Sequence, residues 1–170
     1  MLNLKDHTNQ MLTATRSSKI NISEESKTKL IAEFFSRNLV KGDVLFFYGP
    51  VGVGKTTFIK FLINSLQKKN NTDLTEVTSP TFNLINEYKI GSVLIKHCDL
   101  YRVIDDKELL NLDIFENIMN QITLVEWPEI IKSYKSQNII KLFFEYDDDY
   151  NKRILSVSTY KNIKYLNELA

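Results

Sequence analysis

The feature that most restricts the fold of this chain is a glycine-rich segment between a continuous apolar run and a helical pattern. Residues 49–56 read Gly-Pro-Val-Gly-Val-Gly-Lys-Thr and match the pattern G-x-x-x-x-G-K-[ST] in full. In this pattern successive backbone N–H groups point at phosphate oxygens, and glycines are needed where a side chain would block that approach. The segment therefore predicts a phosphate loop.

The segments on both sides of this loop are the kinds that phosphate binding requires. Residues 43–48 form an apolar run typical of a strand covered on both faces, as in the centre of a parallel sheet. After Thr56, apolar residues recur at helical spacing, and this pattern ends near residues 68–71. The order of strand, loop and helix predicts an α/β fold of the P-loop NTPase type.

Further apolar segments predict the rest of a three-layer sandwich around a mixed, mainly parallel central sheet. The additional strand-like segments are residues 77–88, 92–98, 122–125, 138–146 and 152–158. The first two flank a turn at residues 90–92 and predict an antiparallel pair. The last two flank the acidic turn at residues 147–151 and predict a C-terminal antiparallel hairpin.

Two more helices are predicted from apolar periodicity. Ser23, followed by Glu24 and Glu25, offers an N-cap with acidic residues in the first turn. The apolar face of that helix comprises Leu30, Ile31, Phe34 and Phe35. Residues 105–118 form the second helical pattern, with an apolar side of Leu109, Leu110, Leu112, Ile114 and Phe115.

Length and composition predict one domain. A chain of 170 residues that is 43% hydrophobic suits a single core. Residues 1–19 are polar and lack a period, so we expect a flexible N-terminal extension before a single P-loop ATPase domain at residues 20–170. The formal charge of +1 provides no global field for nucleic acid or membrane, so any RNA contact would be local or through a partner.

Cysteine content and apolar segments indicate the compartment. Cys98 is the single cysteine, so the chain has no internal disulfide partner for it and no multi-thiolate metal site. The first twenty residues lack the apolar core of a signal peptide, and no apolar run approaches the roughly 20 residues that span a bilayer. We expect a cytoplasmic protein without membrane contact.

The phosphate loop predicts a nucleoside triphosphate as the ligand and Mg²⁺ as the cofactor, and we expect ATP as the substrate. Lys55 is expected to reach the β- and γ-phosphates, and the Thr56 hydroxyl is expected to ligate Mg²⁺. Trp127 is either a half-buried core aromatic or a ring beside the nucleotide. The predicted nucleotide-binding residues are Gly49, Pro50, Val51, Gly52, Val53, Gly54, Lys55, Thr56, Thr57 and Trp127.

Two carboxylates follow predicted strands and are candidates to hold Mg²⁺ or to orient the attacking water. Asp99 follows residues 93–98, and Glu126 follows residues 122–125. A carboxylate that ligates Mg²⁺ is occupied, whereas a base must stay free to accept a proton, which favours one task for each. Each is alternatively a solvated strand-end carboxylate. The predicted metal ligands are Thr56, Asp99 and Glu126.

Two more residues have a functional and a structural interpretation. Thr81, in the segment Ser-Pro-Thr-Phe at residues 79–82, is placed like the switch hydroxyls that sense a γ-phosphate and Mg²⁺. The same segment is alternatively an ordinary turn before a strand. His97 is a candidate partner of the γ-phosphate, although a lone histidine in a strand is more often structural.

The order of these motifs resembles the TsaE family, formerly the YjeE family, of small bacterial ATPases. The resemblance extends over residues 20–159. It rests on the phosphate loop and on the segments Ser-Pro-Thr-Phe at 79–82, His-Cys-Asp-Leu-Tyr-Arg at 97–102 and Val-Glu-Trp-Pro-Glu at 125–129.

The resemblance implies an ATPase subunit that supports threonylcarbamoyladenosine synthesis beside the tRNA anticodon, acting with TsaD and TsaB proteins and meeting tRNA through that complex. It implies that Lys55 and Glu126 are catalytic and that Asp99 is the acid on the magnesium side. The chain departs from the family at Pro50, where the family loop usually has an acidic residue. Proline removes one backbone N–H donor, which affects the affinity of the site.

Two other functions remain open. A small-molecule kinase usually closes arginines over the transferred phosphoryl group, but this chain has four widely separated arginines: Arg16, Arg37, Arg102 and Arg153. A nucleotide-binding scaffold that never hydrolyses would share the loop. A GTPase is disfavoured, because residues 151–154 read Asn-Lys-Arg-Ile and lack the closing acid of Asn-Lys-x-Asp.

Overall fold

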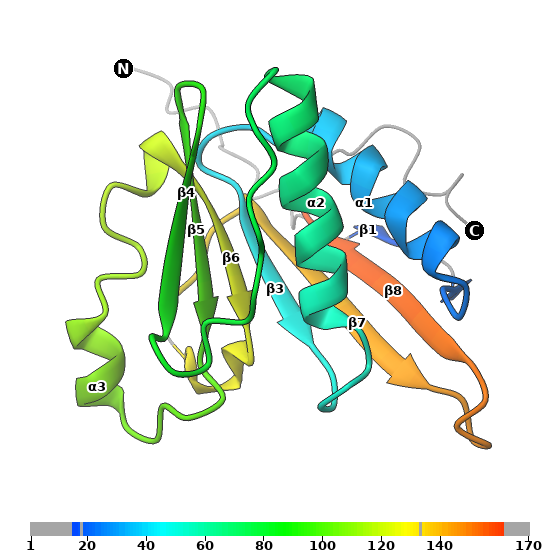
Figure 1. Ribbon diagram of the computed structural model, residues 1–170. Coiled ribbons are helices and arrows are strands. Elements are labelled where there is room, and N and C mark those ends of the chain that lie inside the picture. Colours follow the sequence, from blue (N-terminus) through cyan, green and yellow to red (C-terminus); the bar gives the residue numbers. More distant parts are fainter. Residues whose placement is uncertain (1–14, 18, 133, 162–170) are drawn as a thin grey trace, which may run out of the picture.

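The computed structural model describes residues 15–17, 19–132 and 134–161, and its centre is a set of four parallel strands (Figure 1). In spatial order these strands are β7 (Ile139–Tyr146), β3 (Val44–Tyr48), β6 (Gln121–Glu126) and β5 (Val93–Asp99). Antiparallel strands extend both sides of the sheet. They are β4 (Ile85–Ile90) on β5, β8 (Arg153–Thr159) on β7, and β1 (Thr15–Arg16) and β2 (Ile20–Asn21) on β8.

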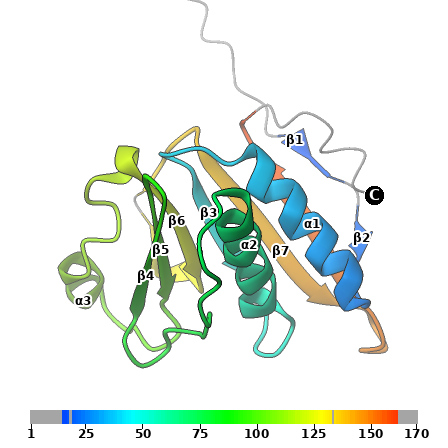
Figure 2. The ribbon, with the colours of Figure 1, turned by 45° about the horizontal axis from the view of Figure 1, so that its top comes forward.

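Helices α1 (Glu25–Asn38) and α2 (Lys55–Lys69) cover one face of this sheet (Figures 1 and 2). Alternate residues of each strand point toward these helices, and the residues between them point toward the opposite layer. The apolar runs therefore contribute side chains to both layers. The fully buried Phe35, Phe47, Phe58 and Phe144 meet here with mutual ring contacts. This cluster anchors α2, and with it the phosphate loop, on the sheet.

The opposite face is covered by the two connections that lead into and out of β6. The first contains α3 (Asp106–Asn111) and the 3₁₀ turn η1 (Ile118–Asn120), and the second contains the 3₁₀ turn η2 (Pro128–Ile130). Leu100, Val103 and Ile114 pack there against strand residues such as Phe46 and Val125. The predicted α/β fold of the P-loop type is confirmed, with its central parallel strands and its C-terminal antiparallel hairpin.

The predicted helix over residues 105–118 is too long. Asp105 accepts a hydrogen bond from the Glu108 N–H and caps α3, but α3 ends at Asn111. Asp113 and Asn117 have φ angles of 46° and 54°, which no right-handed helix contains. This break lets the chain turn and bury Ile114, while Leu110 stays exposed.

Three further local expectations are wrong. Residues 77–84 are not a strand, because β4 begins at Ile85 and the preceding loop contains Pro80, which has no N–H for a ladder. Ser23 is not the N-cap of α1. Glu24 takes that position without a side-chain cap, while the Ser23 hydroxyl accepts from the Arg153 N–H. Leu30 is 64% exposed and lies off the buried face of α1.

The N-terminal region joins the sheet earlier than expected. Strand β1 pairs with residues 158–159 of β8, inside the range expected to be a flexible extension at residues 1–19. Residues 1–14 and 18 lie outside the described residues. None of the helices in the described ranges is long and apolar enough to cross a membrane.

Candidate functional site

The carboxyl ends of the parallel strands bring the predicted site residues to one edge of the sheet. Strand β3 runs directly into the phosphate loop, and the register of β5 and β6 places Asp99 beside Glu126. Ile122 and Leu124 pack beneath the helices α1 and α2. Glu126 lies two residues beyond Leu124, so its side chain is on the same face of the sheet. Open α/β sheets bind ligands at this edge.

The phosphate loop approaches β7 so closely that only glycine fits at its first position. Gly49 has a φ of +134°, and a Cβ added there would collide with the Phe144 carbonyl oxygen. At the other end, Gly54 is the N-cap of α2 with a φ of +113°, and no side chain caps the helix. The first turn of α2 also contains no acidic residue. Its N–H groups and dipole are therefore available to an anion.

Lys55 lies inside the loop, with 4% of its surface exposed. Its Nζ donates to the carbonyl oxygens of Gly49 at 2.6 Å and of Pro50 at 2.9 Å. The same ammonium lies 3.9 Å from the centre of the Trp127 ring, in cation–π contact. Burial lowers the pKa of Lys55, while the negative charge of Glu126, and to a lesser degree Glu129 and Asp99, opposes that shift.

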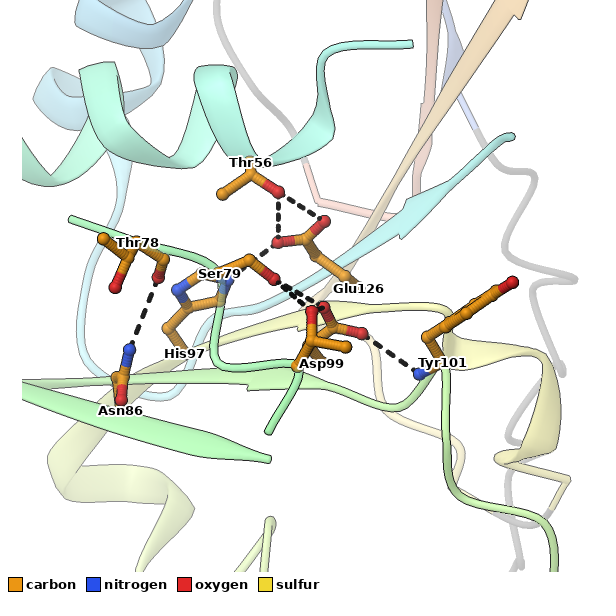
Figure 3. Close-up of polar contacts among 9 residues, drawn as sticks. Thr56, Thr78, Ser79, Asn86, His97, Asp99, Tyr101 and Glu126 are labelled. Carbon is orange, nitrogen blue, oxygen red and sulfur yellow. Dashed lines mark hydrogen bonds and ion pairs between the residues drawn. The ribbon is translucent and has the colours of Figure 1, made fainter. Parts of the chain in front are cut away.

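Glu126 is 2% exposed and is bonded from two sides (Figure 3). The Thr56 hydroxyl lies 2.9 Å from Oε1 and 3.0 Å from Oε2 and donates to this carboxylate. His97, on β5, places Nε2 at 2.9 Å from Oε1. The histidine is fully buried behind Glu126, so it does not face the cleft as a γ-phosphate partner would.

Asp99 is bonded to the loop before β4 (Figure 3). Its Oδ2 accepts from the Ser79 hydroxyl at 2.6 Å and from the Thr81 hydroxyl at 2.7 Å. Its Oδ1 accepts from the Tyr101 N–H at 3.0 Å. The segment at residues 79–82 is thus attached to one of the two candidate acids through two hydroxyls.

Trp127 borders the site in a strained conformation. Its φ and ψ are 57° and 54°, a left-handed geometry that bulky residues rarely adopt and that a following proline disfavours further. Such strain persists where surrounding contacts hold it, and functional sites are where it gathers. Here Trp127 packs on Tyr101, with ring centroids 4.9 Å apart, as well as on Lys55.

These groups line a cleft of about 380 Å³. The lining residues are Val51, Gly52, Gly54, Lys55, Thr56, Thr57, Ser79, Thr81, Asp99, Tyr101, Glu126 and Trp127. Three predicted nucleotide-binding residues lie outside this lining. Gly49 and Pro50 contribute carbonyl oxygens to Lys55, and the Val53 side chain is fully buried in the core beneath the helices.

Sequence reasoning missed three contacts of this site. They are the bond between His97 and Glu126, the bond between Ser79 and Asp99, and the packing of Tyr101 on Trp127. One signal was present. His97 and Asp99 are two residues apart in a strand, so they share a face, and His97 therefore points to the side on which the acids lie.

The donor set suits a hard cation. A hydroxyl and two nearly buried carboxylates meet at the start of α2, and oxygen ligands are those that Mg²⁺ prefers. Within the described parts of the chain, no three His, Cys, Asp or Glu side chains gather into a group that would hold a metal ion alone. Mg²⁺ commonly binds through one or two carboxylates together with substrate phosphates, which agrees with this sparse set.

Comparisons with known proteins identify a matching family model and similar relatives. The family model described as "Threonylcarbamoyl adenosine biosynthesis protein TsaE" matches residues 22–155. A Rickettsia bellii protein named tRNA threonylcarbamoyladenosine biosynthesis protein TsaE is 34% identical over 137 residues, which cover 81% of this chain and 92% of the relative. A protein of the same name from Aquifex aeolicus is 39% identical over 108 residues, covering 64% of this chain and 74% of the relative.

A solved structure shares the fold. The crystal structure of Bacillus subtilis YdiB is similar with a TM-score of 0.68 and 24% identity, over 91% of this chain and 93% of that one. The match of the family model over most of the chain, together with relatives of this identity, confirms the resemblance drawn from the motifs. This chain belongs to the TsaE family of tRNA threonylcarbamoyladenosine biosynthesis proteins.

Proposed function

We propose that this chain binds ATP with Mg²⁺ in the cleft and hydrolyses it, as the ATPase subunit that works with TsaD- and TsaB-type proteins in the cytoplasm. The observation that carries the proposal is the meeting of a phosphate loop, an uncapped helix N-terminus and two buried carboxylates in one cleft. Phosphoryl transfer to water needs positioning and charge stabilisation more than covalent chemistry, and these groups supply both.

The residues divide the work by their positions. The amides at the start of α2 and the Lys55 ammonium would bind the phosphates, after Lys55 leaves the two loop carbonyls that it now contacts. Glu126 lies at the base of the cleft, where it would orient the attacking water and accept its proton. Trp127 and Tyr101 would exclude bulk water from the reacting phosphate.

Mg²⁺ would be held by the Thr56 hydroxyl and by Asp99 or Glu126, and when bound it neutralises charge on the phosphate oxygens. The contact of Thr56 with Glu126 makes Glu126 the alternative magnesium ligand to Asp99, and in that case Glu126 would not be free to act as the base. The bonds of Asp99 to Ser79 and Thr81 favour coupling between Asp99 and the switch-like segment. The division of the two tasks stays a prediction that variants can test.

A second cavity of about 210 Å³ adjoins the cleft at Thr57 and offers room for the nucleoside. It lies between the beginning of α1 and the beginning of β8, and both cavities share Gly52, Gly54 and Thr57 as lining. Phosphates bound at the start of α2 would leave the ribose and base directed over Thr57 into this space. The adjoining cavity therefore supports a nucleoside triphosphate rather than inorganic phosphate as the proposed ligand.

The test is release of phosphate from ATP by the purified protein, with and without TsaD- and TsaB-type proteins, at varied Mg²⁺. We expect slow release by the protein alone, an increase with both partners, and dependence on Mg²⁺. Lys55→Ala should remove nucleotide binding, and Glu126→Gln should remove hydrolysis while binding remains. Exposed residues of matched chemistry serve as controls, because Lys60→Ala on α2 and Glu116→Gln should retain activity.

Other outcomes separate the rival functions. Transfer of the γ-phosphate to a metabolite, without release of phosphate, would indicate a kinase. Nucleotide binding without product, even with both partners present, would indicate a scaffold. Full hydrolysis by the Glu126→Gln variant would contradict the role given to that residue.

A further inference from the structure

The buried histidine of β5 has an unusual set of neighbours for a residue that only fills space. His97 is fully buried, and Figure 3 shows its ring beside the Glu126 carboxylate, which Thr56 approaches from a different side. Its Nε2 contacts Glu126 Oε1 at 2.9 Å. Its other ring nitrogen, Nδ1, is buried and meets no hydrogen-bond partner among the described residues.

The chemistry of the pair assigns the donor. A carboxylate only accepts hydrogen bonds, so Nε2 must carry the hydrogen and donate it to Oε1. Leaving Nδ1 buried without a partner destabilises the fold, and an apolar side chain at this position would avoid that cost. Unsatisfied buried polar atoms are uncommon in native structures. The hydrogen bond from Nε2 to Glu126 explains why a histidine occupies this position although its Nδ1 has no partner among the described residues.

The bond acts on a side chain that would otherwise be free to turn. Glu126 has three rotatable side-chain bonds, and its other contact is the Thr56 hydroxyl, which has a single hydrogen. If that hydroxyl turns toward a metal or a phosphate, Nε2–H still holds Oε1 and leaves Oε2 to face the cleft. Donors behind a reacting carboxylate fix its orientation, and loss of such partners typically lowers activity about 10–100-fold.

We propose that His97 is a positioning residue, whose Nε2–H holds the Glu126 carboxylate in the orientation needed to act on water. The inference rests on the proposed hydrolysis and deepens it, because it names a residue that never touches the nucleotide and still sets the rate. It predicts an effect on kcat and little effect on nucleotide binding.

Two amide variants separate positioning from packing. In His97→Gln the amide nitrogen reaches as far from the backbone as Nε2, so the donor to Oε1 is kept. In His97→Asn the amide is one bond shorter and reaches only the place of Nδ1. We expect kcat within about 3-fold of wild type for His97→Gln and a loss of about 10–100-fold for His97→Asn, with KM for ATP changed less than about 3-fold in both.

A packing control comes from the same strand. Ile95→Val removes buried volume on the same face of β5 without touching Glu126, and it should leave kcat unchanged although it lowers stability. Equal kcat values for His97→Gln and His97→Asn would overturn the proposal. So would a loss that appears in KM alone.

A double-mutant cycle on unfolding tests the contact even if the protein proves not to hydrolyse ATP. The urea midpoints of His97→Asn, Glu126→Leu and the double variant are compared with wild type, because leucine removes the acceptor for Nε2–H whereas glutamine would keep one. If the two side chains are bonded, the shift of the double variant differs from the sum of the single shifts. Additive shifts would overturn the positioning contact itself. If the shifts are non-additive but the wild-type protein does not hydrolyse ATP even with both partners, only the proposed function and the rate effect are overturned.

Discussion

The close approach of the phosphate loop to β7 makes a quantitative prediction about two glycines. Gly49 and Gly54 both have φ angles that L side chains rarely adopt, +134° and +113°. An added Cβ at Gly54 meets nothing within 4 Å, whereas one at Gly49 collides with backbone of Phe144. The pair therefore separates backbone strain, which both alanine variants share, from steric overlap, which only one has.

The magnitudes follow from these two terms. A non-glycine residue in a sparsely populated φ/ψ region costs about 1–3 kcal/mol, so Gly54→Ala should lose about that much stability. Gly49→Ala adds overlap with a strand that cannot move without breaking its ladder, which we set at a further ~1–3 kcal/mol by analogy with overpacked cores. For a chain of this size 1 kcal/mol shifts Tm by about 2–4 °C, so the two variants should differ by about 2–12 °C.

The assay is thermal and urea unfolding of wild type, Gly49→Ala and Gly54→Ala without nucleotide, so that ligand binding does not contribute. The register explains why the overlap is unavoidable. Tyr48 pairs with Phe143, and Gly49 continues β3 along the same partner. If Gly49→Ala unfolds at or above the temperature of Gly54→Ala, the close contact is not a determinant of the loop, and the reasoning from sterics is refuted.

Three further predictions concern single side chains. Thr56→Val should weaken Mg²⁺-dependent ATP binding, measured by calorimetry, and lower stability by about 1–3 kcal/mol, measured by urea unfolding, because buried Glu126 loses a donor. Thr56→Ser should retain both the binding and the stability. Burial raises the pKa of Cys98 from 9.0 to about 12, so its thiol should resist alkylation near pH 8 in the native protein and react after unfolding. Because the unfolded thiol ionises first, stability falls between pH 9 and about 12, and Cys98→Ala should show a smaller fall in urea midpoint over that range. Fluorescence of Trp127, the single tryptophan, should change when ATP binds and draws Lys55 from its ring; an identical ATP response in Lys55→Met would contradict this contact.

The phosphate loop, the central strands and the terminal hairpin were predictable because each rests on local patterns. A glycine-rich loop between an apolar run and a helix can be identified from neighbouring residues alone. Asp99 and Glu126 can be identified in the same way, because each directly follows an apolar strand segment. The end of α3 was not predictable from apolar periodicity, since left-handed residues at Asp113 and Asn117 interrupt a pattern that continues in the sequence.

The partners of the two acids could not be predicted from local sequence. Thr56 and Glu126 are 70 residues apart, and His97 and Glu126 are 29 apart, so only the pairing of β5 with β6 and the position of α2 bring them together. The register of those strands depends on which face is buried. Alternation alone placed His97 and Asp99 on one face, but it did not show which of them would face the cleft.

The contacts of the site connect the identity of residue 50 with the affinity for phosphate. The Lys55 ammonium donates to the Gly49 and Pro50 carbonyls, so a phosphate must exchange those bonds for its own rather than meet a free cation. The bonds to the carbonyls are already charge-assisted through the ammonium, and the phosphate oxygens add a negative charge on the acceptor, so the exchange favours phosphate by less than a count of the new bonds suggests. Proline fixes φ at its own position and gives up an N–H. Pro50 thereby orders the carbonyl that competes for Lys55 and removes a donor that would otherwise assist the phosphate. Both effects would lower the affinity without altering Thr56, Asp99 or Glu126, so a weak intrinsic affinity for ATP would be compatible with the proposed catalytic site.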